Sequence, residues 1–526
     1  MARMKAPPSG ARIRMYRQGQ GDCFLIAFPR SGASPDNPVY LLIDCGIMNG
    51  SEIRDDVDVA TVIDNIHECT NGFIDYVVVT HEHADHVNGF NKKRGGKRIF
   101  EKIDVGQLWL AWTEDGDDAF ANDLRDRFND QLVALAEAEH RLRADTASGV
   151  RSQMVSQLLE LEIGPEAERR TFRDAASTGP IPFAIDGITN KRAIKFLRDH
   201  AEAGPVFLRP GQTAFKIDGT EGALTFVLGP PRDETMLLSL DPVGDEEFHA
   251  RHTLKLSGEA ASFYAAMTKT PGAAGVSPFA PRFATLAKDV EHQGSREVDE
   301  GWSSDDARDR INAYHARTYY GTAGTRDETW RRIDSQWLEM AEPLALRLNH
   351  EVNNTSLVLA FELPESGKVL LFTGDAQRGN WLSWSTLSWE RPDGGTTHAS
   401  DLLGRCVFYK CGHHGSHNAT LNGNVDSDYA NLAWLGKDAP DDEFVAMVPV
   451  HSKWANEKQG WNHPLPAIVD ALMKKARGRV LLNDVKRVKR PKASDGHGKL
   501  TDTEWTAFKD QSIEAKVYKE YIVLDE

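Results

Sequence analysis

YVVVTHEHADH, residues 76–86, joins an apolar run of β-forming residues to three histidines and an aspartate. Val and Tyr favour strands, and an uninterrupted apolar run favours a strand that is buried on both faces. The polar residues follow directly, so we expect them in the loop where that strand ends. Imidazole and carboxylate groups bind zinc and similar divalent ions. The spacing predicts that His81 and His83 face one ion, whereas Asp85 and His86 face a second.

Short runs of the same β-forming kind dominate both ends of the chain. They are bounded by Gly, Asp and Pro, and most are continuously apolar, which is typical of strands in a buried sheet. We predict strands over residues 23–28, 39–43, 76–79, 223–228, 355–361, 369–372, 407–409 and 444–448. This pattern favours the α/β class.

Two long stretches between these strands have a different pattern. Residues 106–202 are predicted to be a helical insertion, because apolar residues from Leu124 to Leu142 recur at helical spacing. Residues 233–345 are predicted to be mixed, with a loop over 268–281 and helix over 303–340. The expected domains are a core of residues 10–105, 203–232 and 346–485, these two insertions, and a C-terminal extension over 486–526.

The composition excludes several classes of protein. The chain has 526 residues, a net charge of −16 and 40% hydrophobic residues, which is enough apolar surface for a folded core and argues against disorder. There is no apolar run long enough for a membrane helix and no apolar segment of a secretion signal near the start, so we expect a cytoplasmic protein without membrane contact. The five cysteines form no CxxC pair, which disfavours disulfides and a cysteine-built zinc site.

Residues 81–86 resemble the HxHxDH signature of the metallo-β-lactamase-fold superfamily. Other motifs of that superfamily have similar counterparts here, in the same chain order: LLIDCG at 41–46, LFTGDA at 371–376 and CGHHGSH at 411–417. The resemblance implies an αββα sandwich interrupted by the two mostly helical insertions. It also implies that Asp44 lies behind the site, that Asp375 bridges two metal ions and that His413 is the last metal histidine.

Within the superfamily, the chain looks most like the soluble hydrolase domain of ComEC-type competence proteins. The motifs that support this resemblance are GQGD at 19–22, NNTSLVL at 353–359, HHGS at 413–416 and NHP at 462–464. The similarity covers the core segments and leaves both insertions without a counterpart. The membrane-spanning region of those proteins is absent, so a role in DNA transport across a membrane does not follow.

One departure from the superfamily concerns the first metal. Many members have a third metal histidine where this chain has Asn353 and Asn354. The first ion would then have His81, His83 and Asp375 as ligands, unless His350 substitutes for the missing histidine. The second ion would have Asp85, His86, His413 and Asp375. We therefore expect two divalent ions. A first site with fewer ligands would bind zinc less tightly, which makes manganese or magnesium credible beside zinc.

Such a centre predicts a hydrolase that uses a metal-bound hydroxide, because a divalent ion lowers the pKa of bound water to about 7. Asp85, His414 and His463 are the expected catalytic residues, and a spare histidine, with His417 as a further candidate, would protonate the leaving group. Supporting roles are expected for side chains that orient ligands or contact substrate. These are Asp22, Asp44, Asn353, Asn354 and Ser416, with Thr420 as a weaker candidate.

The sequence predicts the substrate less specifically than it predicts the metal centre. A phosphodiesterase or nuclease acting on DNA or RNA is favoured by the resemblance and by a basic run over residues 474–492, near Trp454 and Trp461, which could stack bases. Hydrolysis of a small molecule, such as a cyclic nucleotide, lactone or thioester, is an alternative. A third hypothesis is a partner-controlled effector of a defence or toxin system, whose insertions dock a protein. The insertions carry net charges of −6 and −8, which leaves the core near neutral.

Overall fold

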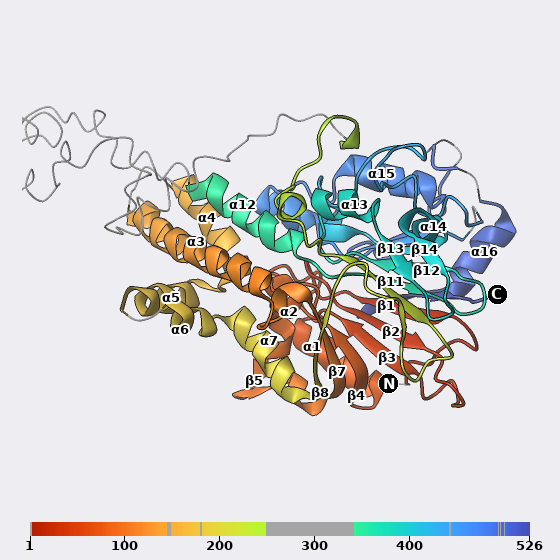
Figure 1. The fold of residues 1–526 in the computed structure, drawn as a ribbon, viewed down its shortest axis with the longest axis horizontal. Helices are drawn as coiled ribbons and strands as arrows, with labels where there is room; N and C mark the ends of the chain where they lie inside the picture. Colours follow the sequence, from red (N-terminus) through yellow and green to blue (C-terminus); the bar gives the residue numbers. More distant parts are fainter. Residues whose placement is uncertain are drawn as a thin grey trace, which may run out of the picture. The chain divides into compact units, whose positions relative to one another are not determined.

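The computed structural model describes residues 3–144, 149–178, 181–248, 341–440, 443–492, 494, 496–498 and 500–526 (Figure 1). The chain divides into two compact units. The first comprises Met1–Asn129, Gln157–Thr253 and Arg347–Glu526, and the second comprises Asp130–Ser156 and Leu254–Leu346. In the second unit, the described residues belong to three helices that continue into the first.

The first unit contains an eight-stranded mixed sheet in the order β18-β19-β1-β2-β3-β4-β7-β8. Strands β3, β4, β7 and β8 are parallel, whereas the pairs from β18 to β3 are antiparallel. The bounds are β1 Ala11–Tyr16, β2 Phe24–Phe28, β3 Val39–Ile43, β4 Phe73–Val78, β7 Asp104–Ala111, β8 Ala201–Leu208, β18 Ser512–Glu514 and β19 Tyr518–Val523.

A second, seven-stranded sheet has the order β17-β16-β15-β12-β11-β10-β9. Its strands β12, β15, β16 and β17 are parallel, and the remaining pairs are antiparallel. The bounds are β9 Phe215–Lys216, β10 Leu224–Gly229, β11 Val358–Glu362, β12 Val369–Phe372, β15 Cys406–Lys410, β16 Val445–Val448 and β17 Val480–Leu482. Two small hairpins complete the strands, β5 Lys93–Arg94 with β6 Lys97–Arg98, and β13 Ser388–Glu390 with β14 Thr396–His398.

The helices have the following bounds: α1 Val59–Thr70, α2 Ala84–Val87, α3 Ala119–Ala144, α4 Gly149–Glu162, α5 Glu166–Thr178, α6 Ile181–Asp186, α7 Thr189–His200, α8 Glu234–Leu237, α12 Ala341–Asn354, α13 Arg378–Trp384, α14 Ala399–Gly404, α15 Pro466–Lys475 and α16 Asp502–Gln511. Among the described residues, none of the helices is both long and apolar enough to cross a membrane.

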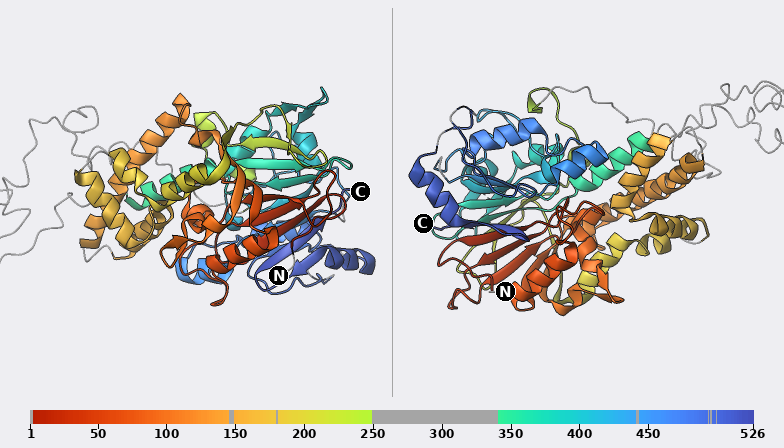
Figure 2. Two further views of the ribbon diagram at one scale, coloured as in Figure 1. Left: turned by 90° about the horizontal axis from the view of Figure 1, so that it is seen from below. Right: turned by 180° about the vertical axis from the view of Figure 1, so that it is seen from behind.

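The two sheets pack face to face. Their inner faces share one apolar cluster in which Phe24 of β2 meets Phe372 of β12, with ring centroids 5.9 Å apart. Helices α1 and α7 cover the outer face of the first sheet, and α13, α14 and α15 cover that of the second (Figures 1 and 2). Burial of both faces explains why central strands such as β2, β3, β11 and β12 are continuously apolar.

The α/β class predicted from the sequence is confirmed, and every predicted strand has a counterpart, with β3 and β12 at the expected bounds. The first insertion contains the helices α3 to α7, as predicted. The insertion was expected to start at residue 106, which instead lies inside β7. The C-terminal extension supplies β18 and β19 to the first sheet. The loop expected over 268–281 and the helix expected over 303–340 lie outside the described residues.

Candidate metal centre

The predicted site residues gather at the carboxyl ends of parallel strands. Asp44 follows β3, residues 81–86 follow β4, Asp375 follows β12, and His413 and His414 follow β15. Parallel strands direct their carboxyl ends to one edge, which is where open α/β sheets bind ligands. Because the two sheets face each other, loops from both meet at this edge.

His86 is fixed by Asp44 from behind. The Nδ1–H group of His86 donates to Asp44 Oδ2 over 2.8 Å, and Asp44 also accepts from the Thr80 amide and hydroxyl. This bond leaves Nε2 of His86 directed inward, 3.2 Å from Asp375 Oδ2 and 4.0 Å from Asp85 Oδ2. The expected position of Asp44, behind a ligand imidazole, agrees with this geometry.

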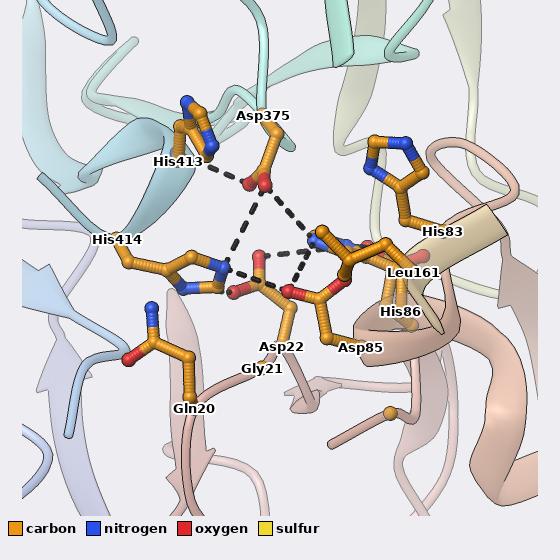
Figure 3. A network of polar contacts seen from close by, with 12 residues as sticks. Gln20, Gly21, Asp22, His83, Asp85, His86, Leu161, Asp375, His413 and His414 are labelled. Carbon is orange, nitrogen blue, oxygen red and sulfur yellow. Dashed lines mark hydrogen bonds and ion pairs between the residues drawn. The ribbon is translucent and has the colours of Figure 1, made fainter. Parts of the chain in front are cut away.

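His414 approaches the same carboxylates from the opposite side (Figure 3). Its Nδ1–H group donates to the Pro449 carbonyl over 2.7 Å, and its Nε2 lies 3.0 Å from Asp85 Oδ2 and 3.6 Å from Asp375 Oδ2. Two imidazoles, each held by its outer nitrogen, therefore converge on two carboxylates. All four side chains are buried.

His413 has a different environment. Its Nδ1–H group donates to Asn418 Oδ1 over 3.3 Å, and its Nε2 accepts from the Asn353 amide over 3.2 Å. Its backbone N–H donates to Asp375 Oδ1 over 3.1 Å. Both ring nitrogens are thus occupied. The structure brings His414, rather than the expected ligand His413, to the inner carboxylates.

The backbone explains how neighbouring histidines come to point differently. His413 and His414 have φ values of 40° and 51°, a region that residues with a Cβ rarely occupy. The two left-handed residues reverse the chain directly after β15 and turn successive side chains away from each other. Strained backbone of this kind is common at functional sites.

His81 and His83 lie beside His86, with the ring centroids of His81 and His86 4.1 Å apart. Nε2 of His81 lies 3.0 Å from Nδ1 of His83, and both rings are buried. The outer nitrogens are engaged elsewhere: His81 Nδ1 lies 3.1 Å from Thr80 Oγ1, and His83 Nε2 lies 2.8 Å from Glu162 Oε1. Two lone pairs 3.0 Å apart repel each other unless a proton or a cation lies between them.

Buried atoms without hydrogen bonds support a cation-binding role. Asp85 Oδ1, Asp22 Oδ1 and His86 Nε2 are buried and have no hydrogen-bond partner. An unsatisfied buried polar atom costs about 1 to 3 kcal/mol, and more when it is charged. Oxygen and imidazole nitrogen are the donors that divalent ions take. The residues present therefore fit a metal ion, and the buried group could hold one.

Asp22 also belongs to this group by distance, because it lies with His86, Asp375 and His414 in one buried set of possible ligands. Its nearest imidazole atoms, however, are Nδ1 of His86 at 4.0 Å and Nδ1 of His414 at 3.7 Å, which already bond elsewhere. Asp22 is moreover paired with the buried Lys410 ammonium. Asp85, which faces the inner nitrogens, is the better placed ligand.

Other residues expected at the site have mainly structural contacts. Asn354 donates to the Leu237 carbonyl and accepts from the Gln377 amide, so it joins α8 to the loop after β12. Ser416 Oγ lies 3.5 Å from His417 Nδ1, and Thr420 bonds the Tyr409 hydroxyl. His417 pairs with Asp241 over 2.9 Å.

His463 and His350 border the centre without reaching its inner atoms. Their ring centroids lie 5.4 Å and 6.3 Å, respectively, from that of His413. Nδ1 of His463 is buried without a hydrogen bond. Burial lowers the pKa of His463 well below its usual value and lowers the pKa of His350 to about 4, so both are neutral at pH 7.

The electrostatics separate the histidines of the centre into two sets. Burial lowers the pKa of His86, but Asp375, Asp22, Asp85 and Asp44 outweigh it and raise the pKa well above 6.5. The pKa values of His83 and His414 are also raised, because carboxylates outweigh burial. Burial lowers the pKa of His81 well below its usual value and that of His413 to about 3. The pKa of Asp375 is depressed, because His86, His414 and Lys410 overcome its burial.

Fewer basic side chains of residues 474–492 are exposed for contact with nucleic acid than the composition suggests. Arg479 is buried and donates to the Phe444 carbonyl, and Arg477 and Arg490 pair with Glu504 and Asp502. Trp454 is buried in a small apolar cluster, so its ring is part of the packing; Trp461 packs against the same cluster and is only partly buried. Lys474 is exposed but pairs with Asp470, and the other exposed cations that follow β17 are Lys486, Arg487 and Lys489, with Lys492 farther along the chain.

Three residues of the centre were not predicted from the sequence. Glu162 contacts His83 from α4, Asn349 donates to Glu162 over 3.5 Å, and Lys410 pairs with Asp22 beside Asp375. Lys410 could have been found, because a lysine at the end of an apolar strand directly before CGHHGSH is unusual. Glu162 and Asn349 carry no local signal, since a single Glu or Asn on a helix is most often exposed to solvent.

No protein-family model matches this chain, and a search of curated proteins finds no match either.

Proposed function

We propose that this chain is a metal-dependent hydrolase of the metallo-β-lactamase-fold superfamily, and more specifically a phosphodiesterase that cleaves DNA or RNA. The observation that carries the proposal is the convergence of His86 and His414 on Asp85 and Asp375, with each outer ring nitrogen already bonded. The two facing sheets with helices outside them support the same family assignment.

Two divalent ions are proposed, and they are zinc, manganese or magnesium. The first would be held by His81, His83 and Asp375, and the second by Asp85, His86, His414 and Asp375. When bound, a divalent ion acts as a Lewis acid and makes an attacking water more acidic. This assignment exchanges His413 for His414 as the last ligand.

The protein residues have distinct tasks in this proposal. Lys410 lies 3.5 Å from Asp375 Oδ1 and reduces the negative charge that a phosphodiester would meet. His463 is neutral, with an unbonded Nδ1, and lies on the His413 side of the centre, where it could exchange a proton with a leaving group. The exposed segment at Lys486 to Lys489 offers positive charge for a phosphate backbone.

The test is hydrolysis of bis(p-nitrophenyl) phosphate and of single- and double-stranded DNA and RNA, with manganese, magnesium or zinc. We expect metal-dependent turnover that falls in Asp375→Ala and His86→Ala by more than the about 10- to 100-fold that loss of an outer-shell partner costs, because each change removes a proposed ligand. Asp104→Ala is the matched control, since Asp104 is an exposed carboxylate at the start of β7.

Two results would contradict this function. Absence of phosphodiester cleavage with all three metals would reject it, and turnover of a lactone or thioester alone would favour small-molecule hydrolysis in its place. Metal content of the purified protein, measured in parallel, would show whether the site is a metal centre whatever its substrate.

A further inference from the structure

Glu162 brings a carboxylate from the first insertion into the metal centre. It lies at the end of α4, and Oε1 accepts the Nε2–H of His83 over 2.8 Å. Both side chains are almost completely buried, with exposures of 2% for His83 and 3% for Glu162. Asn349 of α12 donates to the same oxygen over 3.5 Å, so the carboxylate has a second partner.

The end of α4 is anchored from several sides, so this contact is part of the fold. The Asn190 side chain of α7 donates to the carbonyls of Leu161 and Glu162 over 2.7 and 3.0 Å. Leu161 packs with Met48 and Trp454.

The contact has the same form as the one between Asp44 and His86. In each pair a carboxylate accepts from the outer nitrogen of a histidine, so that a neutral imidazole has its lone pair on the inner nitrogen. For His83 that inner nitrogen is Nδ1, which faces Nε2 of His81. Without an acceptor, a neutral imidazole can place its proton on either nitrogen, and the tautomer with a proton on Nδ1 cannot bind a metal there.

We infer that Glu162 is a positioning residue of the metal centre: it holds His83 in the tautomer and orientation that the first ion requires. The first insertion thereby completes the site that the strands of the core begin. This inference rests on the metal-binding part of the proposed function and is independent of the substrate.

The experiment compares Glu162→Ala with the wild-type protein by zinc and manganese titration of metal-free samples. Loss of an outer carboxylate typically costs about 10- to 100-fold in metal affinity. We expect a loss of this size for one of two ions and little change for the other. Glu162→Gln, whose amide oxygen can still accept from His83, should recover part of the affinity.

The matched control is Glu160→Ala, which removes a carboxylate from the same turn of α4 that contacts Asn49 instead of a histidine. It should bind both ions as the wild type does. Equal affinity for both ions in Glu162→Ala would overturn the inference. So would an equal loss for both ions together with a lower melting temperature of the metal-free protein, because that pattern indicates a general structural role.

A second readout does not depend on metal or activity. Nitrogen NMR of ¹⁵N-histidine-labelled, metal-free protein should show a hydrogen-bonded, protonated Nε2 at His83 in the wild type and its loss in Glu162→Ala. An unchanged His83 signal would also reject the inference. If this signal changes as expected but no phosphodiester is cleaved, the proposed function fails and the role of Glu162 stands.

Discussion

Each histidine of the centre, apart from His413, has one ring nitrogen bonded to a neighbour and one directed inward. The outer partners differ in kind: a carboxylate for His83 and His86, a carbonyl for His414 and hydroxyls for His81. All of them can accept an N–H, so in a neutral imidazole they select the tautomer whose inner nitrogen carries no proton. His413 lacks this division, since both its nitrogens are occupied.

The two sets of histidines predict how the stability of the metal-free protein depends on pH. The raised pKa values of His83, His86 and His414 contribute stability that is complete below pH 6.5 and is lost as the pH rises through the raised values. The lowered values of His350 and His413, about 4 and about 3, contribute stability that is lost as the pH falls below 6.5. In chelator, we therefore expect the melting temperature to be highest near pH 6.5.

Metal should remove the alkaline part of this profile. Ligand imidazoles bind as neutral groups, so a saturating ion replaces their protons and its affinity rises with pH. Thermal melting from about pH 5 to about pH 9, with chelator and with zinc or manganese, measures both profiles. A metal-free melting temperature that increases steadily across the alkaline half of that range would show that these histidines are not protonated in the fold.

How much of the site the sequence predicted depends on where each residue lies. His81, His83, Asp85 and His86 follow one strand in a fixed pattern, and a pattern within one loop is visible in the sequence. The choice between His413 and His414 was not visible, because it is decided by two left-handed backbone conformations. Glu162 could not be predicted either, since it is 79 positions from His83 in the sequence and contacts it only in the folded protein.

At the scale of elements, the loop after β4 is positioned by the segment before β2 and by the turn after β3. Cys45 N–H donates to the His86 carbonyl over 2.8 Å, and Asp22 N–H donates to the Asp85 carbonyl over 3.0 Å. Gly46 lies so close to this loop that a Cβ there would overlap the backbone of Asp85 and His86. The absence of a side chain at Gly46 is thus a condition for the ligand geometry.

Gly46→Ala should displace Asp85 and His86. Overpacking of a rigid interior typically costs about 1 to 3 kcal/mol. We expect a destabilisation of this size and a loss of metal from the second site, measured by thermal melting and by metal analysis.

Gly204→Ala is the control for this change. Gly204 lies in β8, and a methyl group added there would meet no atom within 4 Å, so the variant should melt and bind metal as the wild type does. Full metal occupancy in Gly46→Ala would show that the loop can yield, and that the close approach does not determine the site.

The eight predicted strands were visible in the sequence because burial on both faces makes them continuously apolar, whereas strands with charged or exposed residues, such as β1, β8 and β19, were not predicted. The first insertion was only partly predictable. Its helices α3 to α7 were expected, but the outer face of the first sheet is covered by α7 through Ala193, Ile194 and Leu197. A helical pattern does not state which surface its apolar face will cover, so α7 could not be assigned to the core in advance.

At the scale of the whole chain, the first sheet joins residues that are far apart in sequence. Strand β19 pairs with β1, and the buried Arg14 donates to Glu520 over 2.8 Å across 506 positions. Arg14 also donates to Asn65 of α1 over 2.7 Å and lies over the Tyr518 ring. One guanidinium therefore ties together β1, α1 and β19.

Glu520→Ala should destabilise the protein strongly, because it leaves the charge of Arg14 buried without its partner. Removal of one member of a buried pair typically costs about 3 to 5 kcal/mol. Chemical denaturation in urea measures this loss, with Glu526→Ala, an exposed carboxylate, as the control. A difference below about 1 kcal/mol between the two variants would mean that water or a neighbour satisfies Arg14.

Lys410 has a consequence for the order in which the protein is assembled. Its buried ammonium contacts Asp22, Asp375 and the Gly374 carbonyl, so a permanent internal counter-ion already balances part of the acidic cluster. Small zinc domains without such a counter-charge depend on their ion to fold at all. Here a buried ammonium already balances part of the negative charge, so we expect the polypeptide to fold without metal and any ion to bind the folded chain afterwards.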